Sequence, residues 1–139
     1  MGKIAGKFMN HDKKFYAYLS LAVAETIALI WFSSIPSAEF VPTGVLLRPG
    51  DLEHFIAYSV YGFLWSRVFV NFNEIRGKRE NRILFGLILP LLIGSVAGAA
   101  CETIQLFVPT RVADMLDWAI DAFGSFFGAA IASKFKNLF

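Results

Sequence analysis

The sequence has few charged residues and a single cysteine. Only 17% of its 139 residues are charged, whereas soluble domains usually carry about 25%. Cys101 has no second cysteine with which to form an internal disulfide, and its alanine neighbours offer no metal ligand, so we expect a buried thiol. The net charge of +2 is small and the basic residues form short clusters, so we expect no nucleic-acid partner.

Long apolar stretches are abundant instead, in a chain whose length permits one domain. Four stretches are long enough to cross a bilayer as a helix, which takes about 20 mostly apolar residues. They cover residues 15–35, 55–72, a stretch from 83 that ends by Pro109, and 115–132. None alternates like a barrel strand. The sequence therefore predicts an all-α polytopic membrane protein, a bundle of four transmembrane helices.

The basic residues indicate an orientation. Ten of the thirteen lie in the two tails or between the second and third stretches: Lys3, Lys7, Lys13, Lys14, Arg76, Lys78, Arg79, Arg82, Lys134 and Lys136. The positive-inside rule then makes both termini cytoplasmic. The predicted tails are residues 1–14 and 134–139, and the membrane domain is 15–133. The loops at 36–52 and 109–113, with Arg48 and Arg111, face outward.

Polar residues recur at helical spacing near the outward ends of three stretches. The sets are Asp51, His54 and Tyr58; Glu102 and Gln105; and Asp114, Asp117 and Asp121. Within each set the spacing of three, four or seven residues places the side chains on one helical face. An unpaired carboxylate as deep as Asp121 would cost on the order of 3 kcal/mol. We therefore expect the stripes, with Arg111, to face each other around a polar pocket that opens outward.

Glu25 lies near the middle of the first stretch, and two interpretations stay open. It extends the pocket toward the midplane, or it is a neutral acid hydrogen-bonded to a neighbouring helix.

Small residues and one proline predict how the helices pack. Gly94 with Gly98, and Gly124 with Gly128, form GxxxG pairs that allow helix backbones to approach closely. Such glycine-rich faces would also permit a homo-oligomer. Pro90 frees a backbone carbonyl that a neighbouring helix can satisfy.

The stretch "ETIQLFVPTRVADMLDWAIDAFGSFFG" resembles the signature of the VanZ-like family, roughly E-x-x-Q-x-F-x-P-x-R-x-x-D-x-x-D-x-x-x-N-x-x-G-x-x-x-G. The matching positions are Glu102, Gln105, Phe107, Pro109, Arg111, Asp114, Asp117, Gly124 and Gly128. His54, Phe55 and Tyr58 are similar to that family's second-helix motif. Asp121 stands where the family usually has asparagine, which adds a potential charge to the pocket. The lysine that relatives usually carry upstream of the histidine is not matched.

The resemblance implies a multi-pass protein of the bacterial inner (cytoplasmic) membrane, in a family named for a protein linked to resistance to teicoplanin. Membrane lipids are then partners. We expect the pocket to bind a lipid or cell-wall precursor headgroup. Arg111 would hold a phosphate, and His54, Gln105 and Tyr58 would add hydrogen bonds.

Other functions fit the same residues. An outer-leaflet lipid-modifying enzyme would use a divalent metal or His54 as a general base, although the sequence identifies no catalytic residue and no cofactor. The candidate metal ligands are His54, Glu102, Asp114 and Asp117. A purely structural polar network is a second alternative, and a proton-coupled transporter with a relay from Glu25 to Asp121 is a third.

Overall fold

The computed structural model describes residues 2–36, 49–76 and 81–135, and these ranges are helical apart from short connections. The elements are α1 (Gly2–Ser33), α2 (Pro49–Ile75), the π-helical turn η1 (Leu84–Ile88), α3 (Leu89–Gln105) and α4 (Met115–Lys134). α1 begins at Gly2, so it continues through most of the segment predicted as an N-terminal tail. The basic residues Arg48, Lys78, Arg79 and Lys136 lie outside the described residues.

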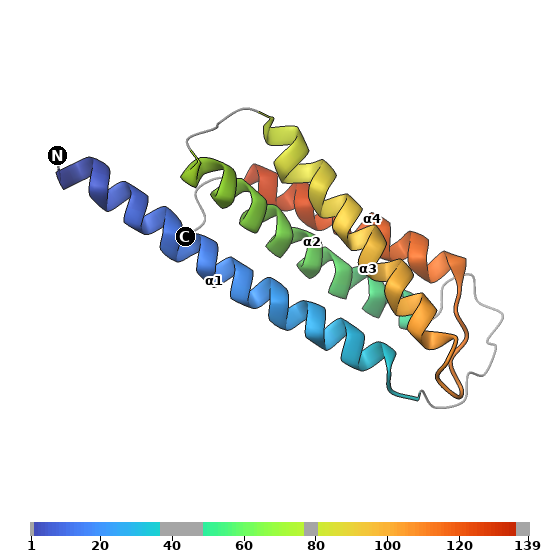
Figure 1. The fold of residues 1–139 in the computed structure, drawn as a ribbon. Helices are drawn as coiled ribbons and strands as arrows, with labels where there is room; N and C mark the ends of the chain where they lie inside the picture. The colour runs from blue at the N-terminus through green and yellow to red at the C-terminus, as the bar shows by residue number, and fades with distance from the viewer. Residues whose placement is uncertain (1, 37–48, 77–80, 136–139) are drawn as a thin grey trace.

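The four long helices form an up-and-down bundle (Figure 1). α2 contacts α1, α3 and α4, and its contact with α4 is the most extensive in the molecule. The last turns of α1 and α3 and the first turns of α2 and α4 meet at one end, which we call the connection end because the α3–α4 connection lies there (Figure 1). This antiparallel order brings the predicted polar stripes to a common level.

Three helical segments are long and apolar enough to cross a membrane: Asp12–Ser33, Leu84–Gln105 and Met115–Lys134. Large apolar side chains such as Trp31, Val96 and Phe123 are exposed on them. Exposed apolar surface of this extent suits a lipid environment, and the chain is a multi-pass membrane protein. The predicted second span lies within α2, which is outside this set and buries polar side chains such as Arg67 and Asn71.

Glycines set the distance between α4 and its two neighbours. A Cβ atom at Gly128 would overlap the carbonyl oxygen of Ser59 on α2, and one at Gly94 would overlap the hydroxyl of Ser125 on α4. The four glycines of the GxxxG pairs are all buried in these contacts within one chain. Both glycine pairs therefore pack within the bundle of a single chain.

The start of α3 is adapted to Pro90. A proline at this position cannot donate a backbone hydrogen bond to the carbonyl of Gly86, four residues earlier. The hydroxyl of Ser66 on α2 donates to that carbonyl instead, at 2.8 Å. The neighbouring helix thus satisfies the freed carbonyl as the sequence predicts, beside a π-helical turn in which the Leu89 amide donates to the Leu84 carbonyl.

Candidate functional site

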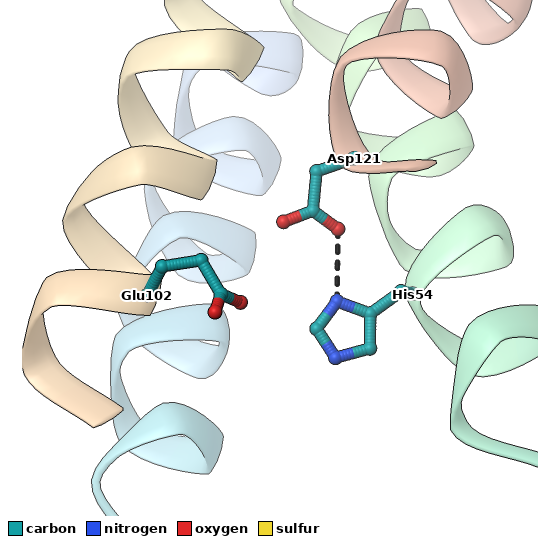
Figure 2. A group of neighbouring side chains, drawn as sticks. All are labelled: His54, Glu102 and Asp121. Carbon is teal, nitrogen blue, oxygen red and sulfur yellow. Dashed lines mark hydrogen bonds and ion pairs between the residues drawn. The ribbon is translucent and has the colours of Figure 1, made fainter. Parts of the chain in front are cut away.

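Three helices bring one histidine and two acids together near the connection end. His54 comes from α2, Glu102 from α3 and Asp121 from α4, and their side chains point toward one another (Figure 2). His54 Nδ1 lies 2.9 Å from Asp121 Oδ1, and one potential ligand atom from each residue lies within 4.8 Å of the other two. Asp121 is completely buried, so this polar group is enclosed by the bundle.

Two of the carboxylate oxygens in this cluster are not satisfied by the protein. Asp121 Oδ2 and Glu102 Oε1 are buried, and neither has a hydrogen-bond partner among the described residues. The other oxygen of Glu102 accepts a hydrogen bond from the backbone amide of Asp114 at 2.7 Å. That bond fixes the Glu102 carboxylate, which points toward His54 and Asp121 (Figure 2).

Asp114 has a clear structural task. It is the N-cap of α4, and its side chain accepts a hydrogen bond from the Leu116 amide at 2.8 Å. Such a cap satisfies one of the free amides at a helix start. The group within ligand distance therefore contains Asp121, and neither Asp114 nor Asp117 of the set that we listed as metal ligands belongs to it. The sequence spacing could not reveal that α4 begins at Met115 and that Asp114 is its N-cap.

A cavity of about 300 Å³ adjoins the cluster through His54, and we call it the connection-end cavity. Its lining combines polar and apolar side chains from α1, α2, α3 and the α3–α4 connection: Leu29, Phe32, Ser33, Glu53, His54, Ala57, Tyr58, Cys101, Gln105 and Arg111. Four of the predicted pocket residues, His54, Tyr58, Gln105 and Arg111, thus line one space. A second hollow of about 370 Å³ lies beside Glu102 and Asp114.

Arg111 connects the α3–α4 connection to the end of α1. Its Nε donates to the carbonyl of Ile35 at 3.1 Å and its Nη2 to the carbonyl of Phe32 at 3.0 Å. The last carbonyls of a helix lack internal partners and carry partial negative charge, so a guanidinium is favourable there. Arg111 therefore caps α1 and at the same time places its positive charge at the wall of the cavity.

Two other buried residues place polar groups at the cavity wall. Gln105 is only 3% exposed, and its side chain lines the cavity. Tyr58 is 2% exposed, and its hydroxyl is unpaired among the described residues. A buried polar group without a partner costs roughly 1–3 kcal/mol. The cavity thus presents hydrogen-bonding groups to whatever enters it.

His54 lies in the first turns of α2, before the predicted span 55–72 and outside the three candidate spans. Its contact with the Asp121 carboxylate raises the pKa of the imidazole above its ordinary value, against the opposing effect of burial. The imidazole and the carboxylate therefore form a coupled pair at the boundary between the cluster and the cavity.

Asp117 and Glu25, the remaining predicted site residues, do not line this cavity. Asp117 is half-buried in the first turn of α4 and contributes its charge to the electrostatic environment of His54. Glu25 is half-buried on α1, one helical turn from Leu29, and forms no hydrogen bond with the described residues. No contact of Glu25 therefore supports either interpretation, and both stay predictions.

Sequence reasoning missed the part that α1 plays in the cavity. Leu29, Phe32 and Ser33 form one wall, and Cys101 lines another as well as being buried. The spacing of Leu29 and Ser33 on one helical face is visible in the sequence, but nothing in it indicates that this face is turned toward the polar stripes.

Comparison with known proteins gives one family. The model of the VanZ/LLP1 family matches residues 6–137, which is nearly the whole chain. The chain matches no curated protein and no solved structure.

Proposed function

Because the chain belongs to the VanZ/LLP1 family, we propose that it is an envelope protein that binds the phosphate-bearing headgroup of a lipid or cell-wall precursor. The headgroup would occupy the connection-end cavity. The protein would span the bacterial inner membrane four times, in a membrane domain at 15–133, with both termini cytoplasmic. The family is named for a protein linked to teicoplanin resistance, and such resistance would be a consequence of this binding.

The composition of the cavity wall is the observation that supports this proposal best. Arg111, His54 and Gln105 offer hydrogen-bond donors suited to a phosphate, while Leu29 and Phe32 offer apolar surface. Phe32 is also 66% exposed on the outside of α1. A lipid has the same two-part character, with a polar headgroup and an apolar chain. The volume of about 300 Å³ lies at the lower end of the usual range for small-molecule sites.

The orientation follows from the distribution of charge. Arg76 and Lys134 lie at the end of the bundle opposite the cavity, with most of the other basic residues of the sequence assigned to that side. Basic residues favour the cytoplasmic side. The connection-end cavity would then open to the outer leaflet, where cell-wall precursors are used.

The same residues favour a second candidate, an outer-leaflet enzyme that hydrolyses a lipid phosphate or ester. The specific observation is the 2.9 Å contact between His54 Nδ1 and Asp121 Oδ1, beside the cavity that His54 lines. A carboxylate can hold an imidazole in the orientation and tautomer that a general base needs. Hydrolysis would require the headgroup to bind first, so binding is tested first.

The binding test uses native mass spectrometry of the protein in mild detergent with added phosphatidylglycerol. We expect wild type to retain the lipid. Gln105→Met should reduce binding without lowering the melting temperature, because it keeps the length of the side chain and removes only the amide at the cavity wall. Arg111→Lys keeps the charge and loses the planar guanidinium, and it should also reduce binding.

Thr103→Ala is the matched control, since Thr103 is exposed on α3 and its hydroxyl bonds to its own helix. Cys101 gives an independent readout because it is the only cysteine and lines the cavity. Its reaction with N-ethylmaleimide should slow when lipid is added. A folded wild-type protein that retains no phosphate-containing lipid, or a Gln105→Met variant that binds as well as wild type, would contradict the proposal.

A further inference from the structure

We propose that His54, Glu102 and Asp121 form a binding site for one divalent transition-metal cation of the Zn²⁺ or Mn²⁺ type. The site lies between α2, α3 and α4, so one cation would join three helices. This inference rests on the contacts of the cluster alone and does not depend on the headgroup proposal.

The geometry of the three side chains suits a shared cation. They converge from three helices on one point (Figure 2), and their potential ligand atoms lie within 4.8 Å of one another. Ligands bonded to Zn²⁺ at about 2.0–2.2 Å lie roughly 3–3.6 Å apart. The 2.9 Å contact between His54 and Asp121 already has nearly this spacing.

Unpaired buried atoms are the second observation, and they point to a ligand that the chain does not supply. Asp121 Oδ2 and Glu102 Oε1 are both buried without a hydrogen-bond partner among the described residues. Among the described residues neither carboxylate pairs with a lysine or arginine, and the ion pair of the cluster is the one between His54 and Asp121. The unpaired hydroxyl of Tyr58 lines the cavity next to His54.

Charge makes this arrangement costly unless a cation is present. Two carboxylates removed from water need compensating charge, and one imidazole can balance at most one of them. A divalent cation would balance both carboxylates and give the two unpaired oxygens a partner. The Asp114 amide that donates to Glu102 Oε2 would then orient a metal ligand, as outer hydrogen bonds commonly do.

The donor set indicates the class of cation. One imidazole and two carboxylates suit zinc, manganese or a similar first-row ion better than calcium, which takes six to eight oxygen ligands. Three protein ligands leave a coordination position free for water or a ligand. Since His54 lines the connection-end cavity, a cation here would also offset negative charge that would otherwise repel a phosphate from that space.

The experiment titrates Co²⁺ into chelator-treated protein in detergent and follows the visible absorption of the ion. We expect saturation at one Co²⁺ per chain, reversed by Zn²⁺. His54→Ala, Glu102→Gln and Asp121→Ala should each weaken Co²⁺ binding about tenfold or more. Glu53→Gln is the control, because Glu53 is an exposed acid of the same cavity but lies outside the cluster.

Melting temperatures show whether a variant that loses Co²⁺ is still folded. If an alanine variant unfolds, Glu102→Gln still tests the proposal, because it keeps the shape of the side chain. Folded wild type without a saturable Co²⁺ spectrum would overturn the proposal. So would cluster variants that bind Co²⁺ as tightly as Glu53→Gln. Because no lipid is added, failure here leaves the lipid-retention result unaffected, and the two proposals fail separately.

Discussion

Asp121 on α4 lies directly against Gly98 on α3. A Cβ atom added at Gly98 would lie 2.9 Å from Asp121 Oδ2 and 3.0 Å from Asp121 Cβ. Real Cβ atoms scarcely ever approach so closely, so a larger residue at position 98 would displace the carboxylate. The glycine pair of α3 therefore makes room for a buried acid as well as for close helix packing.

Gly98→Ala should weaken Co²⁺ binding about tenfold by moving a ligand oxygen, although it changes no charge. The loss of melting temperature should be small, because the end of the Asp121 side chain can shift. The measurement is a Co²⁺ titration beside a thermal melt. Unchanged Co²⁺ affinity in the variant would show that the position of this carboxylate does not matter for the cation.

Gly128→Ala should destabilise the bundle much more than Gly98→Ala. Its Cβ would overlap backbone atoms of Ser59 and Phe63, which cannot rotate away, and overpacking costs typically 1–3 kcal/mol. Gly50→Ala is the matched control, since nothing lies within 4 Å of a Cβ there. In detergent, the melting temperature of Gly128→Ala should be well below that of Gly50→Ala. Equal melting temperatures would contradict the close approach of α2 and α4.

Ser66→Ala should cost about 1–3 kcal/mol, because it leaves the buried carbonyl of Gly86 without a donor. Ser95→Ala is the control, since the Ser95 hydroxyl only bonds to a carbonyl of its own helix. In a double-mutant cycle Pro90→Ala should reduce the cost of Ser66→Ala by restoring a backbone donor. Additive losses of stability would argue against this link.

The proposed orientation predicts which end of the bundle is accessible from outside the cell. In a Cys101→Ser background, Val112→Cys places a thiol at a residue of the α3–α4 connection that is 79% exposed. Arg76→Cys places one at the opposite end, just after α2. A membrane-impermeant maleimide should label position 112 in intact spheroplasts and position 76 only after lysis. The reverse pattern would place the cavity at the cytoplasmic face.

Much of the fold follows from local rules that the sequence obeys. Length and apolar composition were sufficient to predict helices and a membrane protein, and the proline at 90 predicted a freed carbonyl satisfied by another helix. The glycine pairs correctly indicated close packing. They could not indicate that every one of these contacts is made within a single chain, because a helical face carries no record of its partner.

The candidate site was less accessible to sequence reasoning. Helical spacing placed His54, Glu102 and Asp121 on polar faces. It did not fix how each helix is rotated about its axis, and so it did not show which side chains of the three faces meet. By spacing alone Asp114 was equivalent to Asp121. Asp114 is the N-cap because α4 begins at the next residue, and the spacing does not show where the helix begins. Arg111 was predicted to be a pocket residue. Its hydrogen bonds to α1 were not predicted, because they join residues as far as 76 positions apart in the sequence.

The π-helical turn at Leu84–Ile88 affects how the chain tolerates changes of length. Such a turn closes its hydrogen bonds over one residue more than an α-helix does. A one-residue deletion inside it could be absorbed by reverting to α-helix, with everything after Leu89 kept in register. The same deletion between Gly94 and Gly98 would rotate the helix on one side of it by about 100° relative to the other and separate Gly94 from Glu102 on the packing face. Length variation between Leu84 and Gln105 should therefore be confined to the π-helical turn.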